Sequence, residues 1–379
     1  MKKNNIFFRL FFLQILTFSL ALSSAPAVAQ KLQVGSYTFK DGSVYSGELS
    51  GSKPNGKGRA TYRNGDIYEG EFVKGKRQGK GTMIYASGEK YEGDWHQDYQ
   101  HGRGTYYALN NNRYEGMWFK NAKQGDGKMY YYNGDVYDGK WAEDQRNGEG
   151  TYVYKNGAYY KGNWVNDQKH GTGNFDWNDG TKYSGHWVNN KREGMGTYIY
   201  ANGDSYHGMW RADKQDGRGT FRFRNGDVYE GDYLSGERSG EGIFTYANGD
   251  KYQGHFVDGE FSGKGTYTWK DGPASYEGEW KNNQRNGFGT YKRRNSMEYQ
   301  GYWKNNLMDG EGVLRLQSGE RFKGQFKEGK KNGKGTLVNP DGSKFEGHFK
   351  NDEKDGSFKE YDRNGNKIRE GSYKNGRLN

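Results

Sequence analysis

The fold follows from one stretch of the sequence, GEGTYVYKNGAYYKGNW at residues 148–164. The stretch opens with Gly-x-Gly and a β-prone segment, reaches a turn signal at Asn156-Gly157, and ends with Tyr-x-Gly-x-Trp from Tyr160 to Trp164. Asn-Gly between two strand-like segments is the strongest short-range signal for a hairpin. These residues therefore predict a β-hairpin.

Side chains alternate between the two faces of a strand, and directly opposed residues of an antiparallel pair share a face of the sheet. This alternation, here called side-chain parity, predicts how the hairpin closes. A two-residue loop would oppose Tyr160 with Val153 and would divide the rings between the two faces. A three-residue loop keeps the rings and the glycines on one face. We therefore predict a three-residue loop with Gly157 in the left-handed conformation as a β-bulge, and rings that lie over glycines of neighbouring strands.

The Tyr-x-Gly-x-aromatic motif recurs through the chain at a nearly constant step. Of the thirteen intervals, twelve are 23 residues and one, near Pro273, is 24. A fixed period of this length is typical of repeat architectures. The lead residues are Tyr45, Tyr68, Tyr91, Tyr114, Tyr137, Tyr160, Tyr183, Tyr206, Tyr229, Tyr252, Tyr276, Tyr299, Phe322 and Phe345.

The fold class expected from this repetition is all-β: an elongated, single-layer antiparallel sheet of consecutive hairpins, with one 23-residue repeat per hairpin. The polar segments between hairpins, such as Lys281 to Asn286, are expected to form longer loops. The residues expected to hold each repeat together are its lead ring, its glycines and its tryptophan. They are Tyr68, Gly70, Tyr91, Gly93, Trp95, Tyr114, Gly116, Trp118, Tyr137, Gly139, Trp141, Gly148, Gly150, Tyr160, Gly162, Trp164, Tyr183, Gly185, Trp187, Gly194, Gly196, Tyr206, Gly208 and Trp210.

Three submotifs in mutual register, Tyr-x-Gly-x-Trp, Gly-x-Gly and Asn-Gly-Asp, make the chain resemble the MORN repeat over about residues 35–349. The resemblance implies a bacterial, repeat-only member: a solenoid of hairpins that serves as scaffold or tether, with lipid contact often proposed. On this basis residues 30–44 form an N-terminal half-repeat, residues 45–349 an array of about fourteen repeats, and residues 350–379 a degenerate variant repeat that caps the C-terminal end.

The first 29 residues have the pattern of a signal peptide. Lys2 and Lys3 precede an apolar stretch from Leu10 to Leu22, and Ala27-Val28-Ala29 supplies small residues at the expected cleavage site. The alternative is a membrane anchor, which Arg9 and the short apolar run disfavour. We expect cleavage before Gln30 and an exported protein of the periplasm or cell surface.

Composition narrows the function. Removal of Lys2, Lys3 and Arg9 lowers the formal net charge from +11 to +8, and this excess is spread among interleaved signs, which is not a nucleic-acid signature. The chain has no Cys, so disulfides, thiolate metal sites and catalytic thiols are excluded. The mild basic excess is consistent with attraction to anionic lipid headgroups or acidic glycans.

No motif predicts catalysis, a metal or a cofactor. The Gly-x-Gly copies lack the Gly-Lys-Ser/Thr ending and the helix of a phosphate loop. His101 and His170 are three repeats apart, too far to share a metal. The acidic residues after the lead rings, such as Glu69 and Glu92, share their position with Lys161 and other residues in equivalent repeats, which indicates solvated surface.

The tryptophan column allows two interpretations. The rings can form the core of a single-layer sheet, or Trp141, Trp164, Trp187 and Trp210 can line an open groove for a ligand.

We therefore predict a non-enzymatic envelope scaffold that binds a partner protein. The sequence leaves the identity of that partner unknown. The alternative is recognition of phospholipid headgroups or cell-wall glycan. Self-association through open sheet edges is also expected.

Overall fold

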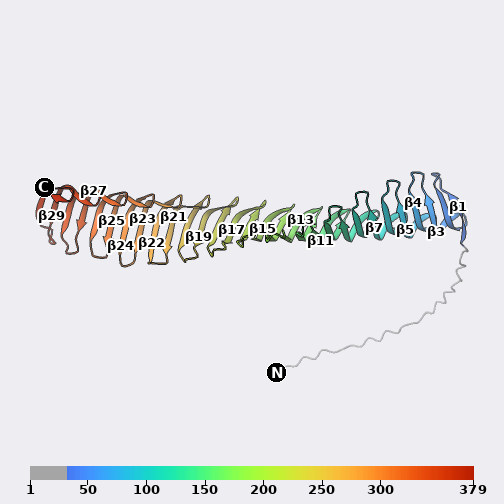
Figure 1. Cartoon of the computed structure of the whole chain (residues 1–379), viewed down its shortest axis with the longest axis horizontal. Helices are drawn as coiled ribbons and strands as arrows, with labels where there is room; N and C mark the ends of the chain where they lie inside the picture. The colour runs from blue at the N-terminus through green and yellow to red at the C-terminus, as the bar shows by residue number, and fades with distance from the viewer. Residues whose placement is uncertain (1–31) are drawn as a thin grey trace, which may run out of the picture.

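A computed structural model describes residues 32–379, and within them every regular element is a β-strand (Figure 1). The predicted signal peptide lies outside the described residues. The strands are β1 (Gln33–Thr38), β2 (Val44–Ser50), β3 (Lys53–Thr61), β4 (Ile67–Val73), β5 (Lys76–Ile84), β6 (Lys90–His96), β7 (Tyr99–Tyr107), β8 (Arg113–Phe119), β9 (Ala122–Tyr130), β10 (Val136–Ala142), β11 (Gln145–Val153), β12 (Tyr159–Val165), β13 (Gln168–Asp176), β14 (Lys182–Val188), β15 (Lys191–Ile199), β16 (Ser205–Arg211), β17 (Lys214–Arg222), β18 (Val228–Leu234), β19 (Glu237–Thr245), β20 (Lys251–Val257), β21 (Glu260–Trp269), β22 (Ala274–Lys281), β23 (Gln284–Arg293), β24 (Met297–Lys304), β25 (Leu307–Leu316), β26 (Arg321–Lys327), β27 (Lys330–Val338), β28 (Lys344–Lys350), β29 (Glu353–Tyr361), β30 (Lys367–Lys374) and β31 (Arg377–Leu378).

Each strand pairs antiparallel with the strand before it and the strand after it. The result is one twisted ribbon in which β1 and β29 lie near opposite ends of the long axis (Figure 1). The predicted fold class is confirmed. Along residues 32–379 no helix has the length and apolarity needed to cross a membrane.

The hairpin turns close as parity predicts. Tyr152 stands opposite Tyr160, so the three residues 155–157 form the loop. The amide of Gly157 donates to the Tyr154 carbonyl at 2.9 Å, and the amide of Tyr154 donates to the Ala158 carbonyl at 2.8 Å. Gly157 has φ of +87°, as a bulge glycine in this loop requires. Rings and glycines therefore share one face of the ribbon, here called the aromatic face; the opposite one is the polar face.

The predicted longer loops between hairpins are wrong. β22 ends at Lys281 and β23 begins at Gln284, which leaves a two-residue turn. Both turn residues have positive φ, +49° for Asn282 and +62° for Asn283, the geometry of a type I′ turn. Asn tolerates this conformation because its short polar side chain can bond locally. The polar residues that suggested a loop belong to the strands instead.

The first glycine of Gly-x-Gly also has a different role from the one expected. Between β10 and β11 the register shifts after the Gly139–Gly150 pair, and Gly148 lies in this irregular segment with φ of +99°. A Cβ at Gly148 would meet the side chain of Lys140 at 3.1 Å and not a ring. Gly194 is equivalent, with φ of +64°. These glycines permit a bulge, whereas the second glycine makes room for the ring.

The core consists of ring contacts within and between repeats. Tyr160 contacts Trp164 edge-to-face with ring centroids 5.1 Å apart, and it contacts Trp187 of the next repeat at 5.6 Å. Its hydroxyl donates to the carbonyl of Asn163 at 2.9 Å. The buried phenol is thus satisfied, and each ring joins two repeats into a continuous core.

Side-chain hydrogen bonds link the repeats along both margins of the ribbon. On the hairpin-loop margin, Oδ1 of Asp135 accepts from the amide of Lys155 at 2.8 Å. On the two-residue-turn margin, Oδ1 of Asp167 accepts from the amide of Arg146 at 3.0 Å. Burial opposes ionisation of Asp135, yet hydrogen bonds from Tyr152, Lys155 and Asn133 hold its pKa below the usual value. Equivalent bonds recur in other repeats, with Oδ1 of Asp204 accepting from the amide of Arg224 at 2.7 Å and Oδ1 of Asp213 accepting from the amide of Arg192 at 2.9 Å.

The C-terminal segment departs from the repeat. Phe358 stands opposite Gly347, where the other hairpins place a second glycine. The ring of Phe358 stacks on Phe345 at a centroid distance of 5.5 Å, and Tyr373 packs against it at 4.6 Å. The residues of β30 are mostly exposed. These two rings cover the last lead ring of the array.

Candidate functional site

The lead rings and glycines form the floor of the aromatic face. The lead tyrosines Tyr68, Tyr91, Tyr114, Tyr137, Tyr160, Tyr183 and Tyr206 are at most 1% exposed. A Cβ at Gly70, Gly93, Gly116, Gly139, Gly162, Gly185 or Gly208 would collide with the Cα of the glycine opposite. A Cβ at Gly150 or Gly196 would collide with the ring of Tyr137 or Tyr183. These residues build the scaffold and leave little surface for a ligand.

The tryptophans are equally buried. Trp95, Trp118, Trp141, Trp164, Trp187 and Trp210 are 3–6% exposed. The indole N–H of Trp141 donates to the Gly127 carbonyl at 3.0 Å, and that of Trp187 donates to the Gly173 carbonyl at 3.1 Å. The four rings considered for an open groove, Trp141, Trp164, Trp187 and Trp210, therefore lie in the core below the accessible surface of this face.

Cations cover these tryptophans, an arrangement that the sequence reading missed. The guanidinium carbon of Arg146 lies 4.3 Å from the ring centroid of Trp164, and Nζ of Lys169 lies 4.5 Å from that of Trp187. Burial lowers the pKa of Lys169. The sequence signal was a basic residue two positions before Gly-x-Gly. It occurs in eight repeats, at Arg77, Lys123, Arg146, Lys169, Arg192, Arg238, Arg285 and Lys331, and Lys354 holds the same position before Gly356-Ser357-Phe358.

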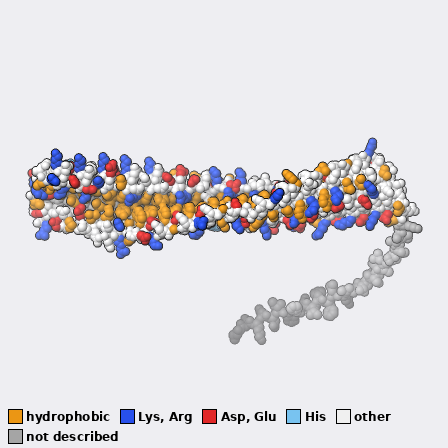
Figure 2. Space-filling model, in the orientation of Figure 1, with side chains coloured by type: hydrophobic (Ala, Val, Ile, Leu, Met, Phe, Trp, Pro, Cys, Tyr) orange, Lys and Arg blue, Asp and Glu red, His pale blue; other side chains and the backbone are white. Residues whose placement is uncertain are grey.

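The accessible part of the aromatic face is a second row of rings beside the hairpin loops, here called the outer aromatic strip. Neighbouring members have centroids 4.2–5.9 Å apart. Most are half-buried. A band of hydrophobic side chains along the long axis is visible in Figure 2. The strip comprises Tyr131, Tyr152, Tyr154, Phe175, Trp177, Tyr198, Tyr200, Phe221, Phe223, Phe244, Tyr246, Tyr267, Trp269 and Tyr291.

A shallow hollow lies along this strip near β13 to β15. Its apolar lining includes Trp177, Tyr198 and the edge of Trp187. Its charged lining consists of Lys169, Arg192 and Asp213, and Arg192 is paired with Asp213 at 3.0 Å. The ring centroids of Trp177 and Tyr198 are 5.7 Å apart. Apolar faces next to fixed cations can accept an apolar group that carries a nearby negative charge.

The acidic residues and histidines do not gather into a reactive centre. Glu69 and Asp138 are exposed, and Glu92 and Glu115 are half-buried, at the same strand position of different repeats. His96 and His101 lie with ring centroids 5.5 Å apart, but between residues 32 and 379 no three His, Asp or Glu side chains are placed to hold a metal ion.

This arrangement defines the chain as a β-hairpin repeat protein with one aromatic and one polar face. A family model for the MORN repeat matches fourteen consecutive segments, and the chain belongs to that family. The matched residues are 45–67, 68–90, 91–113, 114–136, 137–159, 160–182, 183–205, 206–228, 229–251, 252–273, 276–297, 299–321, 322–344 and 345–367. Membership points to a repeat-based binding or scaffold role.

Solved structures resemble the ribbon only weakly. The SAS-4 (dCPAP) TCP domain of Drosophila melanogaster, solved with a proline-rich motif of Ana2, is 16% identical over 41% of this chain and 85% of its own, with a TM-score of 0.27. The TCP10 domain of Danio rerio CPAP is 11% identical over 59% and 97%, with a TM-score of 0.25. A streptogramin B lyase is 11% identical over 76% of this chain and 89% of its own, with a TM-score of 0.13. Comparison with curated proteins gives no match.

Proposed function

We propose that this protein is an exported, non-catalytic scaffold of the cell envelope that binds or tethers a partner protein along its outer aromatic strip. The signal-peptide pattern of residues 1–29 supports export. The observation that carries the binding role is the continuous row of ring contacts from Tyr131 to Tyr291, in which every ring except the buried Phe175 and Phe244 is half-buried. A contiguous accessible apolar surface of this kind is typical of an interaction site.

The shape and charge of the strip favour an extended partner segment. The strip follows the long axis, so a folded domain would cover only part of it, whereas an extended chain can follow ring after ring. Lys169 lies beside the rings, and among residues 32–379 no ion pair joins it to an acidic side chain, whereas Arg192 is paired with Asp213 at 3.0 Å. The preferred partner therefore combines apolar or aromatic side chains with an acidic residue, because Lys169 complements a carboxylate and the rings bury apolar surface.

Repetition supports a binding surface over a reactive one. Carboxylates of the polar face recur at equivalent strand positions in successive repeats, where they are exposed or half-buried. A catalytic pair requires two carboxylates whose surroundings move their pKa values apart. The carboxylates here have equivalent surroundings in successive repeats, which suits a surface that makes the same contact with a partner many times.

Site-specific photo-crosslinking tests the proposal. A benzoylphenylalanine residue is introduced at Tyr200, which belongs to the strip and directly follows β15. In a second variant it is introduced at Thr197, which lies on the polar face of β15. Crosslinking in intact cells should capture one protein from position 200 alone, and a Trp177→Ala/Tyr198→Ala variant should lose it. Equal capture from both positions, or retention of the full-length precursor in the cytoplasm, would refute the proposal. Co-sedimentation with phospholipid vesicles without protein capture would favour lipid recognition instead.

A further inference from the structure

The polar face carries one aromatic pair at a cross-strand position that holds oppositely charged residues in several repeats and two methionines, Met195 and Met209, in another. The equivalent cross-strand positions hold Asp126 with Lys140, which form an ion pair at 2.7 Å. Between β23 and β24 the same positions hold Phe288 opposite Tyr302, with ring centroids 5.5 Å apart and an interplanar angle of 77°. Phe288 is 44% exposed and Tyr302 is 51% exposed. Two half-exposed rings on a face of charges suggest a ligand with an apolar surface.

This pair stands at one end of a groove that continues to β29. The backbones of Gly324 and Gly335 form part of its floor. The side chains before and after each glycine form its walls: Lys323 and Gln325 around Gly324, and Lys334 and Thr336 around Gly335. The other polar residues of the lining are Gln300, Glu311, Glu346, His348, Ser357 and Lys359. The groove therefore combines aromatic rings, amides, hydroxyls, an imidazole, ammonium groups and two carboxylates.

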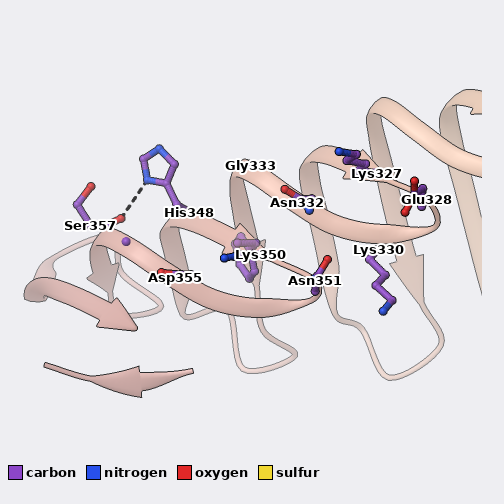
Figure 3. A pocket seen from close by; sticks show the side chains of 12 residues that line it. Lys327, Glu328, Lys330, Asn332, Gly333, His348, Lys350, Asn351, Asp355 and Ser357 are labelled. Carbon is purple, nitrogen blue, oxygen red and sulfur yellow. Dashed lines mark hydrogen bonds between the residues drawn. The ribbon is translucent and has the colours of Figure 1, made fainter. Parts of the chain in front are cut away.

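A second hollow continues the groove towards the two-residue turns (Figure 3). His348 and Ser357 line both hollows, and Nδ1 of His348 lies 3.4 Å from the Ser357 carbonyl. Lys327, Lys330 and Lys350 line the second one. Lys327 and Lys350 occupy the same position in consecutive repeats, which places them about 10 Å apart along the ribbon.

The lysines of the two hollows are available to a ligand. Among residues 32–379, no ion pair joins Lys323, Lys327, Lys330, Lys334, Lys350 or Lys359 to an acidic side chain. The acidic residues of the lining are Glu311, Glu328, Glu346 and Asp355, and Glu346 is paired with Lys344 at 2.7 Å. Residues 321–350 contain eight basic and three acidic side chains. The local field favours an anion.

We propose that this groove binds an acidic oligosaccharide. The apolar face of a sugar ring would pack on Phe288 and Tyr302, its hydroxyls would bond to Gln300, Gln325 and Thr336, and its carboxylates would meet the lysines that recur along the ribbon. A peptide fits less well, because the strands beneath the groove already pair on both sides and offer no backbone partner for peptide N–H and C=O groups. The groove lies opposite the outer aromatic strip, so this proposal is independent of protein capture there.

Calorimetric titration of the exported chain tests the proposal, with oligogalacturonate as the acidic probe and a cello-oligosaccharide of equal length as the neutral one. Oligogalacturonate should bind, with affinity that falls as salt rises. Tyr302→Ala and Lys334→Gln should each weaken binding about tenfold. The matched controls are Met209→Ala and Arg218→Gln, which alter the same positions in another repeat and should leave the affinity unchanged.

Each alternative result has a defined meaning. Equal binding of the neutral oligosaccharide, equal loss in the control variants, or no heat with either sugar at low salt would overturn the proposal. Vesicles containing phosphatidylglycerol that bind through Lys334, while oligogalacturonate does not bind, would assign the groove to a lipid surface and also overturn it. Photo-crosslinking from Tyr200 should be unaffected by Tyr302→Ala, which separates failure of this site from failure of the protein-binding strip.

Discussion

Gly162 stands directly opposite Gly173 in the β12–β13 pair, and the hydroxyl end of the Tyr160 ring lies against both. A Cβ on Gly162 would lie 2.5 Å from the Cα of Gly173 and 2.7 Å from the Tyr160 hydroxyl oxygen. Neither the backbone nor the buried ring can move aside without breaking other contacts. The pair therefore fixes how closely ring and strand approach in each repeat.

Gly162→Val should destabilise the protein by a few kcal/mol, as overpacking of a core does. The measurement is denaturant-induced unfolding followed by tryptophan fluorescence. Lys161→Val is the control, because Lys161 is exposed on the polar face of the same strand and a β-branched residue suits that position. A midpoint for Gly162→Val that equals the wild-type value would contradict the packing described here.

Arg146→Ala should uncover Trp164 and cost about 1 kcal/mol. The guanidinium stacks on the indole, its Nε donates to Oδ1 of Asp167 at 2.8 Å, and a terminal nitrogen donates to the Asp167 carbonyl at 2.9 Å. Contacts of this kind between a cation and a ring contribute about 0.5–1 kcal/mol at accessible sites.

Fluorescence quenching by acrylamide should be stronger for Arg146→Ala than for the wild type. Quenching of Arg146→Lys should be intermediate, because Lys keeps the positive charge but lacks the planar guanidinium. Identical quenching of all three proteins would show that the arginine does not shield the ring.

Alkaline pH should unfold the ribbon. Burial is the main cause that raises the pKa of the twelve lead tyrosines, from Tyr45 to Tyr299, above their ordinary value of 10.0. In the unfolded chain these phenols ionise near pH 10, while the folded chain holds them neutral. The folded state then binds more protons, so its stability is complete below about pH 10 and falls as pH rises further.

Melting temperatures between pH 8 and 11.5, with tyrosinate absorbance recorded in parallel, test this dependence. The melting temperature should fall above about pH 10, and tyrosinate should appear together with loss of strand structure. Full ionisation of the tyrosines in a ribbon that stays folded would contradict the buried arrangement.

Asn283→Ala should weaken the turn between β22 and β23. Asn283 has φ of +62°, and its Oδ1 accepts from the amide of Phe261 at 2.8 Å in the previous repeat. Alanine would lose the hydrogen bond and carry a left-handed penalty of about 1–2 kcal/mol.

Hydrogen exchange at the amides of Lys281 and Gln284 should accelerate in this variant. Asn283→Asp is the matched control, since Asp tolerates the conformation and keeps the acceptor. Unchanged exchange in Asn283→Ala would show that the turn residue does not stabilise the hairpin.

The sequence predicts the structure best at positions where the local geometry permits only one type of residue. Tyr160, Gly162 and Gly157 each recur at a fixed step, so the sheet, its aromatic face and the three-residue loop could all be predicted. The two-residue turn is hard to predict because Asn282-Asn283 lies in a polar segment typical of a longer loop, although both residues tolerate positive φ. The bulge at Gly148 was missed because strand parity assumes an uninterrupted ladder.

The candidate sites were harder to predict, since they depend on neighbours across strands. Arg146 covers Trp164, a residue eighteen positions away, and the recurring basic residue before Gly-x-Gly does not by itself indicate which ring it contacts. Phe288 and Tyr302 are opposed only once the register is known. The outer aromatic strip could be read as a row of β-prone residues, but its accessibility depends on how far the hairpin-loop margin extends beyond the covered tryptophans.

The strands run across the ribbon, and their backbone hydrogen bonds therefore point along its length. Tension applied between the two ends would load these bonds one strand pair at a time, with no second layer to share the force. Such a molecule should open from an end like a zipper, in small steps of one hairpin. Under tension the ribbon would therefore lengthen by successive opening of hairpins, unlike a stiff rod.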